Sequence, residues 1–167
     1  MAVVFPRLLG IAAVLALTAC QFQPLHGNSS ALSQSGGLQN VSVSQVDSRV
    51  AQQVRNHLLF LLNGGNGTAE KSHEARIRVS WDNKLLAALP NVQDATSGSV
   101  TVTVSYDLVD LSTGTAVASG TRKATASYDR TGQVFANERA ERDAENRAAR
   151  EAAESLRLAI ASDMNRA

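Results

Sequence analysis

Residues 100–108 alternate strictly between apolar and polar side chains. The apolar positions are Val100, Val102, Val104, Tyr106 and Leu108, and the positions between them are Thr101, Thr103, Ser105 and Asp107. Successive side chains of a β-strand point to opposite faces, so this segment predicts a strand with one apolar and one polar face. One-sided strands are typical of antiparallel sheets, because parallel sheets are usually covered on both faces. The chain is therefore expected to contain a mainly antiparallel sheet with one hydrophilic face.

Three further segments have the pattern of strands. Residues 75–82 alternate apolar side chains with Arg76, Arg78, Ser80 and Asp82, and residues 116–127 follow a turn at 112–115. A shorter strand is predicted within residues 39–46, where two valines alternate with serines. For residues 85–98 the pattern leaves two alternatives open, an extension of the strand or a long loop.

Two segments have helical periodicity. Residues 47–62 place Val50, Val54 and Leu58 on one side, with Asp47 or Ser48 available as the N-cap. The Asn-Gly-Gly sequence at 63–65 is expected to end this helix. Residues 136–164 place alanines, Leu156 and Ile160 on one side and alternating arginines and acids on the other. The alternating signs indicate a solvated outer surface.

The order strand, helix, three strands, helix predicts an α+β fold. Two helices pack on one face of a four-stranded, mainly antiparallel sheet. With 167 residues, 44% of them hydrophobic, the chain is long enough for one core. Residues 38–167 are predicted to form a single domain.

The amino-terminal segment has the order of an export signal. Arg7 precedes the uninterrupted apolar run 8–17, and Leu17-Thr18-Ala19-Cys20 follows it. The run is too short to cross a bilayer, which needs about 20 residues. The Leu-Thr-Ala-Cys sequence resembles the lipobox of bacterial lipoproteins, in which the cysteine is acylated. Residues 1–19 are therefore expected to be a signal peptide, Cys20 the lipidated residue and 20–37 a tether; the alternative is an incidental free cysteine.

Charge and motif content argue against several classes of function. The 16 basic and 15 acidic side chains leave no net positive field, which argues against nucleic acid as a partner. One cysteine excludes an intramolecular disulfide and a cysteine-rich metal site. No sequence motif of a nucleophile, phosphate loop or metal protease is present, and Asp82, Asp107 and Asp110 are expected to be solvated rather than catalytic. The sequence predicts a protein without enzymatic activity, metal or cofactor; a hydrolase remains only if Ser, His and Asp converge in space.

The chain resembles the LptE family of lipopolysaccharide-assembly lipoproteins in its alphaproteobacterial form. The resemblance rests on residues 18–27 (TACQFQPLHG), on the order of strands and helices, and on residues 135–140 (FANERA) before the alanine-rich helix. Gln21 and His26 depart from the Gly and Tyr expected at these positions. The resemblance implies a periplasm-facing lipoprotein of the outer membrane, held there by its lipid anchor. It also implies that the protein plugs the LptD β-barrel translocon, assists its assembly and binds lipopolysaccharide.

The candidate lipopolysaccharide-binding residues are Arg76 and Arg78 in the second strand with Arg122 and Lys123 in the fourth. They are the compact basic positions outside the last helix, and guanidinium and ammonium groups bind phosphate. Ordinary exposed strand charge is an equally good interpretation. The alternative function is that of a structural adaptor lipoprotein in another envelope secretion or transport assembly.

On one side of the last helix, the first turns carry glutamates and the later turns carry alanines. Glu138, Glu141 and Glu145 share an azimuth with Ala152. Either the first turns overhang the sheet, or the acids face a cation on a partner or on residues 122–130. Overhang is the preferred prediction.

Overall fold

The computed structural model describes residues 33–64, 70–86 and 96–166. The unit Ser35–Ala167 contains the sheet and both long helices. In chain order the elements are the 3-10 helix η1 (Ser33–Asn40), β1 (Val41–Val43), α3 (Arg49–Asn63), β2 (His73–Leu86), β3 (Ser97–Asp110), β4 (Ala116–Asp129) and α4 (Val134–Met164). The predicted signal peptide and Cys20 lie outside the described residues.

The four strands form one sheet in the order β1-β2-β3-β4. β2, β3 and β4 are antiparallel neighbours, whereas β1 lies parallel to β2. The parallel pair follows from the connection, because α3 carries the chain back over the sheet between β1 and β2. The predicted α+β fold and its element order are confirmed, with a sheet that is mixed and mostly antiparallel.

The boundaries of β1, β2 and β3 differ from those expected from the sequence. β2 continues to Leu86, so residues 85 and 86 extend the strand, and β3 begins at Ser97. Residues 87–95 lie outside the described part. β1 is only three residues long, because η1 occupies the positions before Val41. The predicted strand at 39–46 was therefore too long.

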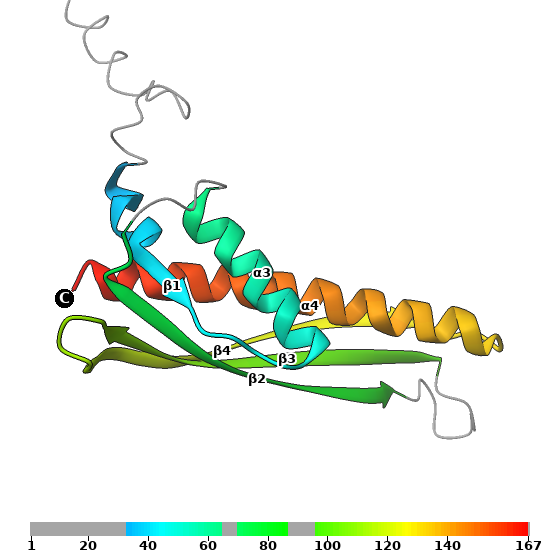
Figure 1. Cartoon of the computed structure of the whole chain (residues 1–167). Helices are drawn as coiled ribbons and strands as arrows, with labels where there is room; N and C mark the ends of the chain where they lie inside the picture. The colour runs from blue at the N-terminus through cyan, green and yellow to red at the C-terminus, as the bar shows by residue number, and fades with distance from the viewer. Residues whose placement is uncertain (1–32, 65–69, 87–95, 167) are drawn as a thin grey trace, which may run out of the picture. The chain divides into compact units, whose positions relative to one another are not determined.

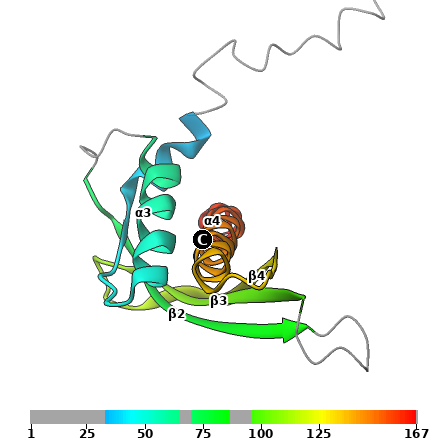
Figure 2. The ribbon, with the colours of Figure 1, turned by 90° about the vertical axis from the view of Figure 1, so that its right-hand side faces the viewer.

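Both helices lie on the same face of the sheet (Figures 1 and 2). Ser48 is the N-cap of α3, where its hydroxyl accepts a hydrogen bond from the amide of Ala51 at 3.2 Å. Gly64 ends α3 in the left-handed conformation, with φ 56°. Both caps are as the sequence predicted, with Ser48 rather than Asp47 in the role.

The core lies between the helices and the sheet. Its largest fully buried side chains are Tyr106, Leu58, Leu108, Leu156 and Ile160. α4 contributes mainly alanines to this core: Ala144, Ala148, Ala149, Ala152 and Ala153 have no exposed surface. Small side chains let the helix backbone lie close to its neighbours, which explains why a chain with few aromatic residues still buries a continuous core.

Two tyrosines pack over glycines on the neighbouring strand. Tyr128 lies opposite Gly98, and Tyr106 lies opposite Gly120. A Cβ atom on Gly98 would lie 2.4 Å from the Tyr128 ring, and one on Gly120 would lie 2.9 Å from the Tyr106 ring. The absence of a side chain at these glycines therefore makes room for the rings on the helix side of the sheet.

Candidate functional site: the helix-free face of the sheet

The face of the sheet turned away from the helices is hydrophilic. Ala75 and Ile77 of β2 are buried beneath the helices, so the even-numbered residues of β2 point the other way. Strand register then defines the helix-free face by these residues: Arg76, Arg78, Ser80, Asp82, Lys84, Thr101, Thr103, Ser105, Asp107, Thr121, Lys123, Thr125 and Ser127. None of these residues is large and apolar; Leu86, the next even-numbered residue of β2, adds one apolar side chain at the strand end and is 46% exposed. The centre of this surface is therefore suited to contact with water or with a polar partner.

Hydroxyl groups form cross-strand pairs on this face. The Oγ1 atoms of Thr101 and Thr125 lie 2.9 Å apart, and Ser105 Oγ lies 3.1 Å from Thr121 Oγ1. Both pairs join residues directly opposite one another on β3 and β4. Such pairs stabilise a sheet without apolar contacts, and they hold the hydroxyl groups in fixed positions.

The four cations of this face differ in their partners, and Lys84 Nζ lies 3.9 Å from Asp82 Oδ2. Arg78 donates to Asp107 Oδ2 at 2.9 Å, and Arg76 donates to Glu74 Oε2 at 2.9 Å. Lys123 makes no ion pair with any residue that the structure describes. A phosphate could therefore bind Lys123 without displacing a described carboxylate. At Arg76 and at Arg78 it would compete with the carboxylate that is already bound.

The structure places three of the four predicted site residues on one face of the sheet. Strand register puts Lys123 level with Ser80, two residues along from Arg78 and four from Arg76, with β3 between them. Arg76, Arg78 and Lys123 lie on the helix-free face, whereas Arg122 points to the helix side. Consecutive residues of a strand cannot share a face, so Arg122 and Lys123 are necessarily separated by the sheet. This alternation could have been applied to the sequence, and it would have removed Arg122 from the cluster.

Arg122 lies near the contact between β3 and the end of α4. There Tyr106 donates its hydroxyl hydrogen to Asp163 Oδ2 at 2.6 Å. Burial and the bond to Asp163 raise the pKa of Tyr106 to about 12, while the charges of Arg122 and Arg166 act in the opposite direction. The Arg122 side chain therefore belongs to the electrostatic surroundings of this structural contact.

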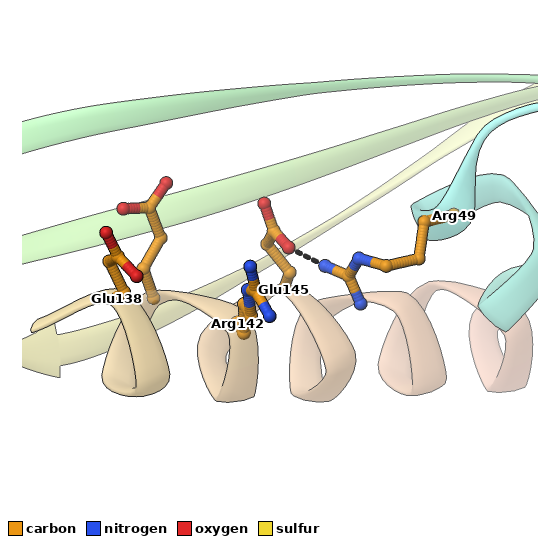
Figure 3. Close-up of a pocket in the computed structure, with 5 residues that line it drawn as sticks. Arg49, Glu138, Arg142 and Glu145 are labelled. Atoms are coloured by element: carbon orange, nitrogen blue, oxygen red, sulfur yellow. Dashed lines mark ion pairs between the residues drawn. The ribbon is translucent and has the colours of Figure 1, made fainter. Parts of the chain in front are cut away.

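A second polar cluster lies where the front of α4 passes the start of α3 (Figure 3). A cavity of about 380 Å³ is lined there by Arg49, Glu138, Glu141, Arg142 and Glu145. Glu145 forms an ion pair with Arg49, and its side chain is only 13% exposed. The cation facing the acids comes from α3, so for Glu145 neither the overhang nor residues 122–130 is the explanation. Sequence reasoning missed Arg49, although its place one residue after the N-cap puts it at the helix end that an α4 acid can reach.

The three aspartates considered as catalytic pairs have separate structural roles. Asp107 binds Arg78, and Asp82 lies 3.9 Å from Lys84. Asp110 accepts hydrogen bonds from the amide and hydroxyl of Ser112, which lower the pKa of its carboxyl group. In residues 33–64, 70–86 and 96–166, no group of three His, Cys, Asp or Glu side chains could hold a metal ion.

Three solved structures of bacterial lipoproteins are similar to this chain in fold. A lipoprotein from Caulobacter crescentus has 21% sequence identity and a TM-score of 0.64, covering 78% of this chain and 95% of its own. Rare lipoprotein B from Shewanella oneidensis has 15% identity and a TM-score of 0.56, covering 75% and 95%. A minor lipoprotein from Acinetobacter baumannii has 15% identity and a TM-score of 0.53, covering 74% and 90%. At these identities the likeness establishes the fold.

The family is established by the sequence itself. The LptE family model, described as "Lipopolysaccharide-assembly", matches residues 38–160, and the chain belongs to this family. No curated protein matches the chain. LptE proteins are non-enzymatic lipoproteins associated with the outer membrane and with lipopolysaccharide assembly. Among the described helices, none is both long and apolar enough to span a membrane.

Proposed function

We propose that this chain is a lipid-anchored plug of an LptD-type β-barrel, binding lipopolysaccharide and helping to deliver it to the outer leaflet. The observation that carries the proposal is the hydrophilic helix-free face. The lumen of a large outer-membrane barrel is polar, so a plug must present hydroxyl and charged groups rather than apolar side chains. The cross-strand pairs Thr101–Thr125 and Ser105–Thr121 give the face this character over two strands.

The anchor in this proposal is Cys20. Two or more acyl chains on one cysteine give stable membrane attachment, whereas one chain gives only marginal binding. The mature protein would then start at residue 20, with a tether before the folded domain and the domain facing the periplasm.

The lipopolysaccharide contact in this proposal lies on the helix-free face. Arg76, Arg78 and Lys123 present cations there within a field of hydroxyl groups, and phosphates bind such donors. Lys123 is the residue to test first, because no described carboxylate competes for it.

Co-purification from outer membranes tests the barrel partner. Affinity-tagged full-length protein is solubilised from membranes, and the bound polypeptide is identified by mass. A large β-barrel bound in equal amount supports the plug, and Thr125→Arg on the helix-free face should weaken its capture. Gln53→Arg on the exposed side of α3 is the matched control. Capture of a different envelope machine without a barrel would replace the plug by the adaptor function.

Adjacent residues of β4 provide a matched pair for lipopolysaccharide binding. Lys123→Glu reverses a charge on the helix-free face, and Arg122→Glu reverses the next charge along the strand on the opposite face. Purified lipopolysaccharide should bind the first variant about tenfold more weakly, which corresponds to about 1.4 kcal/mol, and the second nearly as well as wild type. Equal binding by the two variants would contradict a contact on this face.

A further inference from the structure

The residues of the helix-free face lie in rows that cross β2, β3 and β4 on the side turned away from the helices (Figure 2). Strand register places Lys123 in one row with Thr103 and Ser80. The next row on one side contains Arg78, and the next row on the other side contains Asp82. Among the described residues, Arg78 is therefore the one cation in a row adjacent to Lys123.

An ion pair turns Arg78 away from Lys123. The Nη2 atom of Arg78 donates to Asp107 Oδ2 at 2.9 Å. Register places Asp107 opposite Arg76, which lies two residues along from Arg78 in the direction away from the row of Lys123. The carboxylate of Asp107 thus holds the Arg78 guanidinium on the far side, and Lys123 is left without a second cation beside it.

The ion pair between Arg78 and Asp107 is exposed to solvent. The side chain of Arg78 is 67% exposed and that of Asp107 is 34% exposed. Exposed ion pairs change an equilibrium by no more than about fivefold, so a ligand can displace the carboxylate. A phosphate group can accept two parallel hydrogen bonds from a guanidinium, and such a bidentate pair is stronger than the single bond that Asp107 accepts.

The spacing of the sheet allows Arg78 and Lys123 to bind the same phosphate. Their Cα atoms are separated by two strand spacings and by two residues along the strands, which is about 12 Å. Across this distance both long side chains can lean over the hydroxyl groups between them. Arg76 and Lys84 lie four residues along from the row of Lys123, or about 17 Å from it. Only fully extended side chains would bridge that distance, so these two cations are poorly placed to share its ligand.

We propose that Lys123 and Arg78 form a two-cation clamp for one phosphate group, and that Asp107 limits the affinity of the clamp by holding Arg78 while it is empty. Phosphate binds Lys123, and Arg78 then exchanges the Asp107 carboxylate for phosphate oxygens. Because the ion pair must break, binding is weaker than two free cations would give, which suits a protein that passes its ligand on. This inference rests on the proposed function: it names phosphate as the group bound by the helix-free face and Asp107 as the residue that sets the affinity.

Replacing Asp107 should strengthen binding, a gain that misfolding cannot produce. In Asp107→Asn the guanidinium of Arg78 is released, so the full-length protein should bind purified lipopolysaccharide about fivefold more tightly than wild type in a titration at constant salt. Glu74→Gln is the matched control. It releases Arg76 from an equivalent ion pair, yet Arg76 is too distant to join Lys123, so binding should stay within about twofold of wild type. Unchanged or weaker binding by Asp107→Asn would overturn the proposal.

A double-mutant cycle separates the clamp from a general effect of negative charge. Asp82→Asn removes a carboxylate from the row adjacent to Lys123 without releasing Arg78. Any gain from Asp82→Asn should persist in the Arg78→Gln background, whereas the gain from Asp107→Asn should disappear there. An equal gain from Asp107→Asn with and without Arg78 would mean that Asp107 acts only through its charge, and would overturn the clamp.

The choice of ligand tests the chemistry of recognition. Lipopolysaccharide stripped of its phosphates should bind Asp107→Asn no more tightly than wild type, and a gain with this ligand would overturn the clamp. Titration with inorganic phosphate distinguishes the two sources of the group. The same order of variants with inorganic phosphate would show that the clamp recognises phosphate itself. An order found only with lipopolysaccharide would show that it recognises phosphate attached to the lipid headgroup.

Lys123→Glu distinguishes failure of the clamp from failure of the proposed function. If this variant binds lipopolysaccharide as well as wild type does, the contact on the helix-free face is wrong and the clamp is wrong with it. If Lys123→Glu weakens binding while Asp107→Asn leaves it unchanged, the contact stands and the clamp alone is overturned.

Discussion

The hydroxyl of Tyr106 joins the middle strand to the last turns of α4. Its partner Asp163 is largely buried, with a side chain 15% exposed. Because folding raises the pKa of Tyr106 from 10 to about 12, the folded state binds this proton more tightly than the unfolded state. The resulting stability is complete below pH 10 and is lost as the pH rises toward 12.

Tyr106→Phe should therefore lower the free energy of unfolding at neutral pH by about 1 kcal/mol, the usual contribution of one hydrogen bond. The difference from wild type should disappear between pH 10 and pH 12. Denaturant unfolding of both proteins across this range measures it. A difference that grows with pH would mean that the tyrosinate is the stabilised form.

At the front of α4, the structure distinguishes acids that the sequence pattern grouped together. Glu145 is largely buried and paired with Arg49, whereas Glu141 lines an open cavity without an ion pair to a described residue. Glu145→Ala should cost about 1 to 2 kcal/mol, since it leaves Arg49 without its carboxylate. Glu141→Ala should change stability by less than about 0.5 kcal/mol. Thermal unfolding measures both, and equal losses would contradict the distinction.

Ala152→Glu, on the same side of α4, is expected to lower the free energy of unfolding far more than Glu141→Ala. Ala152 is fully buried, so the new carboxylate would enter the core without a cation, at a cost of roughly 3 kcal/mol or more. A variant that melts within a few degrees of wild type would show that this part of α4 can move away from the sheet.

The sequence shows which side chains are charged, but its local patterns do not predict which of these side chains contact one another in the fold. Alternation along the strands is enough to place Lys123 and Arg122 on opposite faces. The Arg49–Glu145 pair joins residues 96 positions apart, and the Tyr106–Asp163 bond joins residues 57 apart. Such contacts depend on where α3 crosses α4, which local periodicity does not determine.

Among the elements, β3 and β4 are fixed against each other by the tyrosine rings that cover Gly98 and Gly120. Gly98→Ala should cost about 1 to 3 kcal/mol, because its methyl group would overlap the Tyr128 ring and force a shift. Gly132→Ala is the matched control, since a Cβ atom there meets nothing within 4 Å. Circular dichroism melting of the two variants measures the difference, and similar melting temperatures would show that the Tyr128 ring moves aside readily.

Element types could be predicted from the sequence far better than element ends. Period-two and helical patterns identified every strand and both long helices. The start of β1 was wrong because Gln39 and Asn40 belong to η1, and the end of β2 was undecided because Leu85 and Leu86 lie on a half of the strand that the helices do not cover. Alternation of apolar and polar residues arises because one face of a strand is buried. Where neither face is buried, this pattern cannot predict where the strand ends.

For the whole molecule, attachment to the membrane is expected to depend on Cys20. Cys20→Ser should move the protein from the membrane fraction to the soluble periplasmic fraction, because the variant loses its acyl chains and the 16 basic and 15 acidic side chains leave almost no net charge to bind an anionic surface. Fractionation with labelled fatty acid measures both attachment and acylation. Label retained by the variant would contradict Cys20 as the acylated residue.

The parallel pairing of β1 with β2 implies an order of assembly. β2, β3 and β4 are antiparallel neighbours in sequence order, and α4 packs on β3 and β4, so these contacts can form without any residue before His73. β1 and α3 are made first, yet β1 has no strand partner until β2 exists. Amide hydrogen exchange should therefore be faster in β1 and α3 than in β3, with this first segment opening as a separate cooperative unit. In a cell that exports such a chain, β1 and α3 must therefore be kept from binding other polypeptides until β2 is available to pair with β1.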